Sequence, residues 1–360
     1  MTNHFMLFPS CVPVRGATNS AIYDLARHRL ILFPTAYFDV LVNIDRTVIE
    51  ESIREFYSDS QRSRVEDLVQ YLVDSEVAFF TEAPSHFPDL DEKMLSPSVI
   101  HNSVIDVDGF LHDFELLFRQ LDALGCEYIQ VRGFSSLVDP NVASLIAKAA
   151  CDTSIRSVEI LTRYDPKVGN EQWVAALRQN KILSHLTLHS APGNSVTCVS
   201  ATESDDRIIQ YAAAQVRSAS VCGVIQLGEI SAPSIAVYLE TKRFNGCLNK
   251  KIAISADGAI RNCPSMARSF GVAGITTLEE VADNAEFRRA WALRKDDIKV
   301  CKDCEFRYVC TDCRAYVVDP SDELSKPAKC SYDPYTGKWS GPNRERAVGR
   351  FDMRASPGIS

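Results

Sequence analysis

The chain has 360 residues, of which 46% are hydrophobic and 24% charged, as is typical of folded proteins. This length is enough for two or three domains with buried cores, and no apolar run approaches the roughly 18 residues of a membrane span. With 39 Lys and Arg against 47 Asp and Glu, the formal net charge is −8, which argues against a nonspecific nucleic-acid surface. The first residues lack a basic segment followed by a long apolar stretch, so we expect no secretory signal and a cytoplasmic location.

The first 82 residues predict a small β-then-α unit. The expected elements are a hairpin (21–25 and 30–33), three amphipathic helices (around 37–44, 48–56 and 65–72) and a strand (77–81). This order is that of a winged helix-turn-helix, because the apolar faces of such a short unit have only one another to pack against. We therefore expect a winged-helix-like domain over residues 1–82.

A proline-rich linker is expected over residues 83–98, and from residue 99 to about 245 strands alternate with helices. The expected strands are 100–107, 128–131, 158–161, 186–188 and 224–227, and the expected helices are 110–124, 141–150, 171–179 and 205–216. Such β/α units either close into a barrel or form an open parallel sheet. The local pattern leaves both closures open.

The twelve cysteines fall into a scattered set and a crowded C-terminal set. Cys126 and Cys151 lie beside apolar residues, where a free cysteine is usually part of the core. Cys198 and Cys222 remain candidate ligands because they precede the crowded set, although a structural role is favoured. His185 and His189 are expected to be structural rather than a metal pair.

Seven cysteines crowd the last third of the chain. Cys247 and Cys263 flank a predicted hairpin with a turn at Asp257-Gly258, which would bring the two thiols together. The others follow as Cys301-x2-Cys304-x5-Cys310-x2-Cys313, with Cys330 further on. In a reducing compartment CxxC pairs indicate metal more often than redox catalysis, and both zinc and iron–sulfur clusters accept thiolates. Two sites need eight ligands, so one ligand position is left open.

The spacing Cys247-x10-Gly258-x4-Cys263, followed by the four-cysteine run and Cys330, resembles the SPASM domain of radical SAM peptide-modifying enzymes. More narrowly, the segments LFPSCVPVRGATNSAIYDLARHRLILFP (7–34), ISADGAIRNCPS (254–265), KVCKDCEFRYVCTDCRAY (299–316) and KPAKCSYDPYTGKW (326–339) resemble the SPASM-domain peptide maturase of grasp-with-spasm systems. The resemblance implies two [4Fe–4S] clusters. Carried over by position, the ligands are Cys247, Cys263 and Cys313 for cluster I and Cys301, Cys304, Cys310 and Cys330 for cluster II.

The radical SAM motif CxxxCxxC is missing from this chain. The loop after the predicted strand 100–107 reads Asp108-Gly109-Phe110-Leu111, and the next cysteine is Cys126. Without three thiolates there, no cluster with an open iron can bind S-adenosylmethionine, so we expect no such cofactor. The resemblance then implies three parts: a degenerate, partial radical SAM-like (β/α) barrel over 99–245, a SPASM cluster domain over 246–340 and a tail over 341–360.

The resemblance also implies a role in the maturation of a ribosomally made, post-translationally modified peptide, with an ATP-grasp ligase and the precursor peptide as partners. We expect the leader of the precursor to join a sheet edge in the N-terminal domain. The expected residues are Leu30, Ile31, Leu32 and Phe33 on the edge strand and Val65, Leu68, Val69 and Leu72 on the facing helix.

The sequence leaves three alternative functions open. The cysteines could hold zinc in a scaffold without catalysis, or an open cluster position could bind substrate in an independent enzyme. A DNA-binding winged helix is disfavoured by the net charge and by the scarcity of Lys and Arg in residues 66–72.

Overall fold

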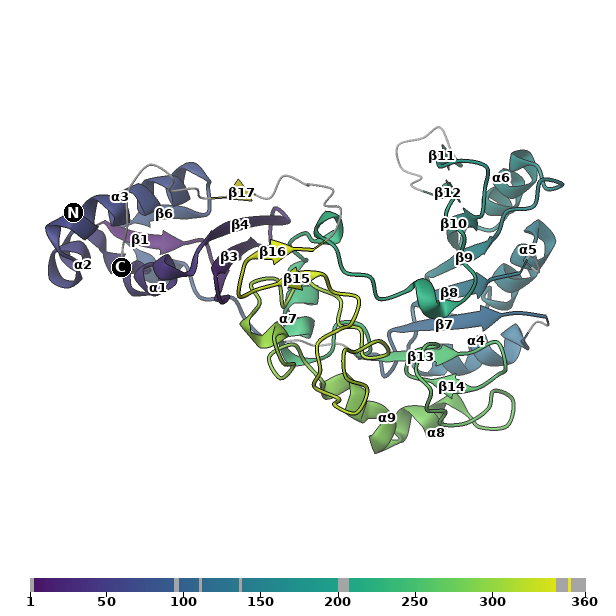
Figure 1. Cartoon of the computed structure of the whole chain (residues 1–360). Coiled ribbons are helices and arrows are strands. Elements are labelled where there is room, and N and C mark those ends of the chain that lie inside the picture. The colour runs from purple at the N-terminus through teal and green to yellow at the C-terminus, as the bar shows by residue number, and fades with distance from the viewer. Residues whose placement is uncertain are drawn as a thin grey trace.

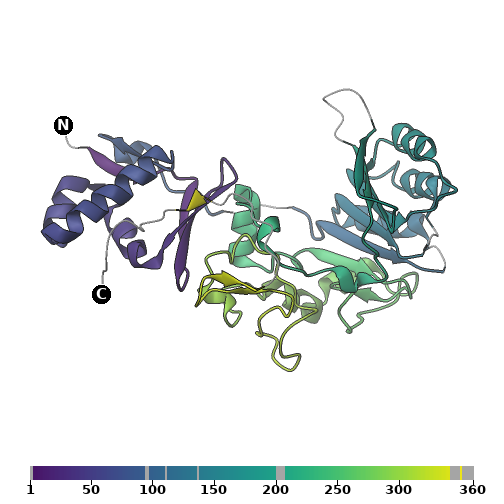
Figure 2. The ribbon, with the colours of Figure 1, turned by 45° about the horizontal axis from the view of Figure 1, so that its top comes forward.

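The computed structural model describes residues 3–93, 97–109, 112–135, 138–199, 207–340 and 349–350. The molecule is elongated and has a mixed α/β fold (Figure 1). An N-terminal unit of small sheets and helices forms one end, an eight-stranded sheet forms the other, and the cysteine-rich segment lies between them, as a second view confirms (Figure 2). None of the helices in the described residues is long and apolar enough to cross a bilayer.

The N-terminal unit contains two small sheets and three helices. In one sheet β1 (His4–Leu7) lies between β5 (Thr47–Val48) and β6 (Ala78–Thr81), and in the other β2 (Cys11–Val14), β3 (Asn19–Asp24) and β4 (Arg29–Pro34) follow in antiparallel order. The helices are α1 (Phe38–Ile44), α2 (Ile49–Phe56) and α3 (Asp59–Asp74). The predicted hairpin, helices and last strand are confirmed. β1 and β2 were not predicted, since β1 pairs only with residues more than 40 positions away.

A core within the N-terminal unit explains the apolar stripe of α3. The helix begins at Ser58, whose side chain forms a reciprocal capping box with Gln61. Leu68 and Leu72 are fully buried against Leu41 and Ile44 of α1 and against β1. The stripe is thus mainly core.

The other face of β2–β4 forms a second core with the C-terminal half of the chain. Tyr23 of β3 is fully buried there among aromatic side chains that include Tyr238, Phe306 and Tyr332. Its hydroxyl donates a hydrogen bond to the carbonyl oxygen of Glu305 at 2.5 Å. The N-terminal sheet and the cysteine-rich loops therefore share one aromatic core.

The large sheet has the strand order β11-β12-β10-β9-β8-β7-β13-β14. Its strands are β7 (Asn102–Val107), β8 (Tyr128–Gly133), β9 (Ser157–Arg163), β10 (Leu183–His189), β11 (Ser195–Cys198), β12 (Ile208–Ala212), β13 (Lys251–Ile254) and β14 (Ile260–Arg261). All neighbouring pairs are parallel except β11–β12 and β13–β14. The two end strands, β11 and β14, do not pair with each other, which is consistent with a partial barrel.

Helices cover one face of this sheet. α4 (Phe114–Ala123), α5 (Pro140–Ala149) and α6 (Asn170–Gln179) lie side by side on it (Figure 1). α7 (Ile235–Arg243) lies beside the N-terminal sheet, and α8 (Leu278–Asp283) and α9 (Ala285–Arg289) lie near β14.

Two predictions in this part were wrong. Residues 208–212, expected in a helix, form strand β12, because they pair with both β10 and β11; Asp205 and Asp206 lie outside the described residues. Residues 224–227, expected as a strand, make only an isolated bridge between Ile225 and Cys330 before a short 3-10 helix, Leu227–Glu229. The tail over 341–360 lies outside the described residues except β17 (Gly349–Arg350), which pairs with β4. The domain boundaries stay predictions.

Replacing Tyr23 with Ala should lower the free energy of unfolding by about 3–5 kcal/mol, because it empties the centre of the shared aromatic core. The matched control is Val42→Ala in α1, whose side chain is 51% exposed and which should change stability by less than about 0.5 kcal/mol. Urea unfolding of the full chain measures both variants. An equal loss of unfolding free energy in the two variants would contradict the shared core.

Candidate metal centres

The hairpin predicted between Cys247 and Cys263 is confirmed. β13 and β14 pair through Ala253–Arg261 and Ile254–Ile260, and Gly258 takes the turn with a φ of +82°. The two cysteines lie beyond the open end of this hairpin and line a common cavity.

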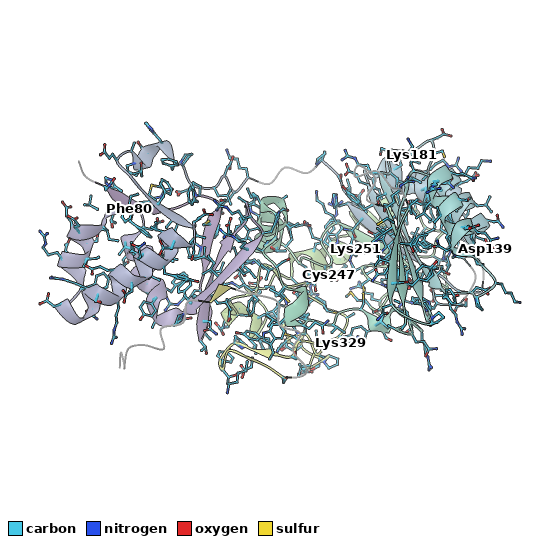
Figure 3. All side chains as sticks on the ribbon, turned by 90° about the horizontal axis from the view of Figure 1, so that it is seen from above. Phe80, Asp139, Lys181, Cys247, Lys251 and Lys329 are labelled. Atoms are coloured by element: carbon cyan, nitrogen blue, oxygen red, sulfur yellow. The ribbon has the colours of Figure 1, made fainter. Side chains whose placement is uncertain are left out.

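The cavity has a volume of about 270 Å³, and four thiols line it: Cys222, Cys247, Cys263 and Cys313. We call these four cysteines the first thiol group. Val104 of β7 and Gln130 and Arg132 of β8 form part of its wall. The cavity therefore lies against the large sheet, where Figure 3 places Cys247 and Lys251.

Cys222 was not assigned as a ligand from the sequence. The loop that carries it is attached to the C-terminal segment, because Lys329 donates hydrogen bonds to the carbonyl oxygens of Ser220 and Cys222. Gly223 allows the close approach, since its φ is +82° and an added Cβ would lie 2.7 Å from the Cys313 sulfur. In the sequence Cys222 was a candidate ligand only because it precedes the seven-cysteine pattern, and a structural role was favoured.

The remaining four cysteines form the second thiol group: Cys301, Cys304, Cys310 and Cys330. Cys330 interacts electrostatically with Cys301 and Cys310, and Cys304 interacts with the same two residues. A short 3-10 helix (Cys301–Asp303) and a backbone bond from Cys310 to Phe306 shape the loop. The two groups contain the same cysteines as the two expected ligand sets, with Cys222 added to the first.

Burial raises the pKa of several of these thiols. It raises the pKa of Cys310 to about 11 and that of Cys304 well above its usual value, and it also raises the pKa of Cys263 and Cys301. Metals bind the thiolate, so metal uptake at these positions must release protons and must weaken as the pH falls.

The second thiol group lies beside a surplus of buried positive charge. Lys295 and Arg314 both form ion pairs with Asp312, at 3.4 and 2.6 Å, and all three side chains are almost fully buried. Burial lowers the pKa of Lys295, but the charges of Cys310, Asp312 and Cys301 raise it further, so the lysine stays charged. Lys295 and Arg314 thus share the one carboxylate of Asp312 near Cys301 and Cys310, and thiolates there would balance the second charge, while a further buried acid, Glu305, adjoins Cys304.

The first thiol group has a different electrostatic environment. Arg132 is paired with Asp106 through two hydrogen bonds of 2.7 and 3.0 Å, so its charge is largely balanced. Lys251 places its Nζ 3.6 Å from the Cys247 sulfur, in a half-buried position.

Within the described part of the chain, no three His, Cys, Asp or Glu side chains form a ready-made site for a single metal ion. A tetrahedral zinc keeps each sulfur about 2.3 Å from one centre, whereas a cubane cluster binds each thiolate at a different iron and so holds the sulfurs further apart. Four thiols around one cavity fit a cluster in the first group.

His185 and His189 have hydrogen-bond partners within the sheet, as expected for structural histidines. The His189 ring bonds to the carbonyl oxygen of Gly133 at 3.2 Å and to Ser190 Oγ at 3.1 Å, and burial lowers its pKa. His185 lies 3.4 Å from the side-chain oxygen of Gln210.

The residues expected to bind a leader peptide are placed differently from the expectation. Leu30, Ile31, Leu32 and Phe33 lie in β4, which pairs with β3 on one side and β17 on the other, so β4 is not a free edge. Val65, Leu68 and Leu72 are buried in the core. Val69 lies at the edge of that core and also lines a groove of about 420 Å³ formed with Ile49, Ile53 and Phe80.

The chain matches no known protein family and no curated protein. Three crystal structures of Streptococcus suis SuiB are similar at 9–10% identity and TM-scores of 0.41, 0.39 and 0.37: SuiB bound to S-adenosylmethionine, SuiB alone, and SuiB bound to the precursor peptide SuiA. They cover 90%, 89% and 86% of this chain and 98%, 98% and 96% of SuiB, in the same order. Because all three TM-scores are below 0.5, no argument about this chain is drawn from these structures.

Replacing Gly223 with Ala should push Cys313 out of the first thiol group and lower the bound metal there, because the new Cβ meets the sulfur at 2.7 Å. Gly274→Ala is the matched control: it has a φ of +83° but no atom within 4 Å of an added Cβ. Metal analysis after anaerobic reconstitution compares the two. Equal metal content in both variants would contradict the placement of Cys313.

Proposed function

We propose that this protein is an iron–sulfur accessory or maturation protein for a ribosomally synthesised, post-translationally modified peptide. It binds the precursor peptide and acts with an ATP-grasp ligase. The observation that carries the proposal is the gathering of eight cysteines into two groups of four, one of them beside a buried surplus of positive charge. The peptide and the ligase follow from the sequence resemblance to the grasp-with-spasm maturases.

Each thiol group would hold one [4Fe–4S] cluster. Cys222, Cys247, Cys263 and Cys313 are the ligands in the first group, and Cys301, Cys304, Cys310 and Cys330 in the second. When bound, such clusters supply one-electron transfer, and they also hold their loops together. The alternative of an independent enzyme needs an open coordination position, and our proposal assigns that position to Cys222, which lines the same cavity as Cys247, Cys263 and Cys313. The zinc scaffold stays the alternative, and metal analysis separates it from the cluster proposal.

The protein is not expected to cleave S-adenosylmethionine. The loop after β7 carries no cysteine, and its Asp108 instead accepts a hydrogen bond from Ser135 Oγ at 2.8 Å. At the ends of β7 and β8, the buried Asp106–Arg132 pair takes up the available hydrogen bonds. We propose that this part of the chain keeps the barrel scaffold without the radical chemistry.

We place the peptide-binding edge at β6 rather than at β4. β6 pairs with β1 on one side, and no strand of the described residues pairs with its other side. Phe80 of β6, which is 42% exposed, also lines the groove that Ile49 and Ile53 of α2 and Val69 of α3 form. An extended peptide would bind through its backbone to β6 and place alternate side chains in the groove.

The peptide edge and the first thiol group lie in different parts of the molecule, as the labels of Phe80 and Cys247 show (Figure 3). A segment anchored at β6 therefore leaves the rest of the precursor free to extend along the molecule. This separation suits a precursor whose leader is recognised at one place and whose core is modified at another.

A Cys→Ser substitution at any member of the two thiol groups should remove one cluster, which is about four irons per chain, and leave the other cluster intact. Cys222→Ser should affect the same cluster as Cys263→Ser, whereas Cys304→Ser should affect the other. Cys198→Ser in β11 is the control and should keep all the iron, because Cys198 lines neither group. Iron and sulfide analysis after anaerobic reconstitution measures the losses.

Two results would refute the metal assignment. Stoichiometric zinc without iron would favour the scaffold alternative. Full iron content in Cys222→Ser, together with a loss in Cys198→Ser, would show that the eighth ligand was chosen wrongly.

Phe80→Glu should weaken the binding of a synthetic precursor leader to the full chain by tenfold or more, because it replaces the aromatic side chain of the groove with a negative charge. Val42→Glu, at an apolar position of α1 that is 51% exposed, should bind the leader normally. Fluorescence anisotropy with labelled leader measures both. Unchanged binding in Phe80→Glu, combined with tighter binding after removal of residues 341–360, would instead favour the edge of β4.

A further inference from the structure

Lys295 is a buried lysine beside the second thiol group. Lys295 is 4% exposed, and its Nζ lies 3.8 Å from the Cys301 sulfur and 3.4 Å from Asp312 Oδ1. A lysine is rarely buried to this extent without a charged partner, so its ammonium must be balanced nearby.

Asp312 does not balance Lys295 by itself. Its carboxylate is also paired with Arg314 at 2.6 Å and accepts a hydrogen bond from Asn245 Nδ2 at 3.0 Å. Arg314 is held in place because it donates hydrogen bonds to the carbonyl oxygens of Glu323 and Ser325. The remaining positive charge of Lys295 is therefore directed at Cys301.

The first thiol group also has a lysine close to a cysteine sulfur, but this lysine is more exposed to solvent. Lys251 lies 3.6 Å from the Cys247 sulfur, but it is half-buried and lines the cavity. A charge that water reaches is screened much more strongly than one in the protein interior. The other cation there, Arg132, is already paired with Asp106.

We propose that Lys295 is a positioning residue that raises the reduction potential of the second cluster above that of the first. Adding an electron makes a cluster more negative, so a buried cation that donates to a ligand sulfur stabilises the reduced form. One electron shared between the two clusters would then reside mainly on the second cluster, because that cluster has the higher potential. This inference rests on the proposed function.

The test is a redox titration of the reconstituted full chain, followed by electron paramagnetic resonance, in the wild type and in Lys295→Met. Cys263→Ser and Cys304→Ser backgrounds assign each signal to one cluster. Lys295→Met should keep its iron. It should lower the midpoint potential of the second cluster by about 59 mV, which is a tenfold change in the one-electron redox equilibrium constant. Lys295→Arg should restore most of the shift, because it keeps the charge and the donor.

Lys251→Met is the matched control. It should lower only the midpoint potential of the first cluster, and by less than Lys295→Met lowers that of the second. An unchanged potential in an iron-replete Lys295→Met protein would overturn the inference while leaving the proposed function intact. If Lys295→Met loses iron, Lys295→Gln gives the same measurement with a neutral donor, and loss of the second cluster from both would also overturn it. A wild-type chain that binds no iron would instead refute the proposed function.

Discussion

The aromatic core between strand β3 and the cysteine-rich loops is the contact on which the second thiol group depends. Residues 295–340 contain only a short 3-10 helix and two-residue strands, so regular secondary structure does not position their cysteines. Instead, Cys304 and Cys330 pack against the core that contains Tyr23. Backbone bonds from Ala17 to Asp303 and from Thr18 to Pro334 attach the turn between β2 and β3 to the same loops.

This shared core links the N-terminal unit to the loops of the second thiol group. The N-terminal sheet buries one face against its own helices and the other against the loops of the second thiol group. The N-terminal unit expressed alone would expose the second face, including Tyr23 and Leu30. Binding experiments therefore need the full chain, and a change in either end is expected to be felt in the other.

The two thiol groups differ in how their charge is balanced, and this difference follows from their surroundings. The first group lies in a cavity against the large sheet, with a half-buried lysine and an arginine that is already paired. The second group lies in loops with a buried lysine and arginine that share one carboxylate. Under the proposed function, two clusters with the same ligand type would then differ in reduction potential, because charge and burial also set the potential.

The sequence by itself determined the local elements and singled out the cysteines that are candidate ligands. The hairpin of β3 and β4, helices α1 to α6 and the turn at Gly258 follow from periodicity and turn residues, which act over a few positions. Seven of the eight clustered cysteines were recognisable from their spacing. Only the tertiary structure decided the rest: β12 is a strand because β10 and β11 flank it, and β4 is covered because residues 349–350 pair with it. Cys222 joins Cys247 because Lys329, more than 100 residues away in sequence, holds its loop, and no local pattern encodes such a contact.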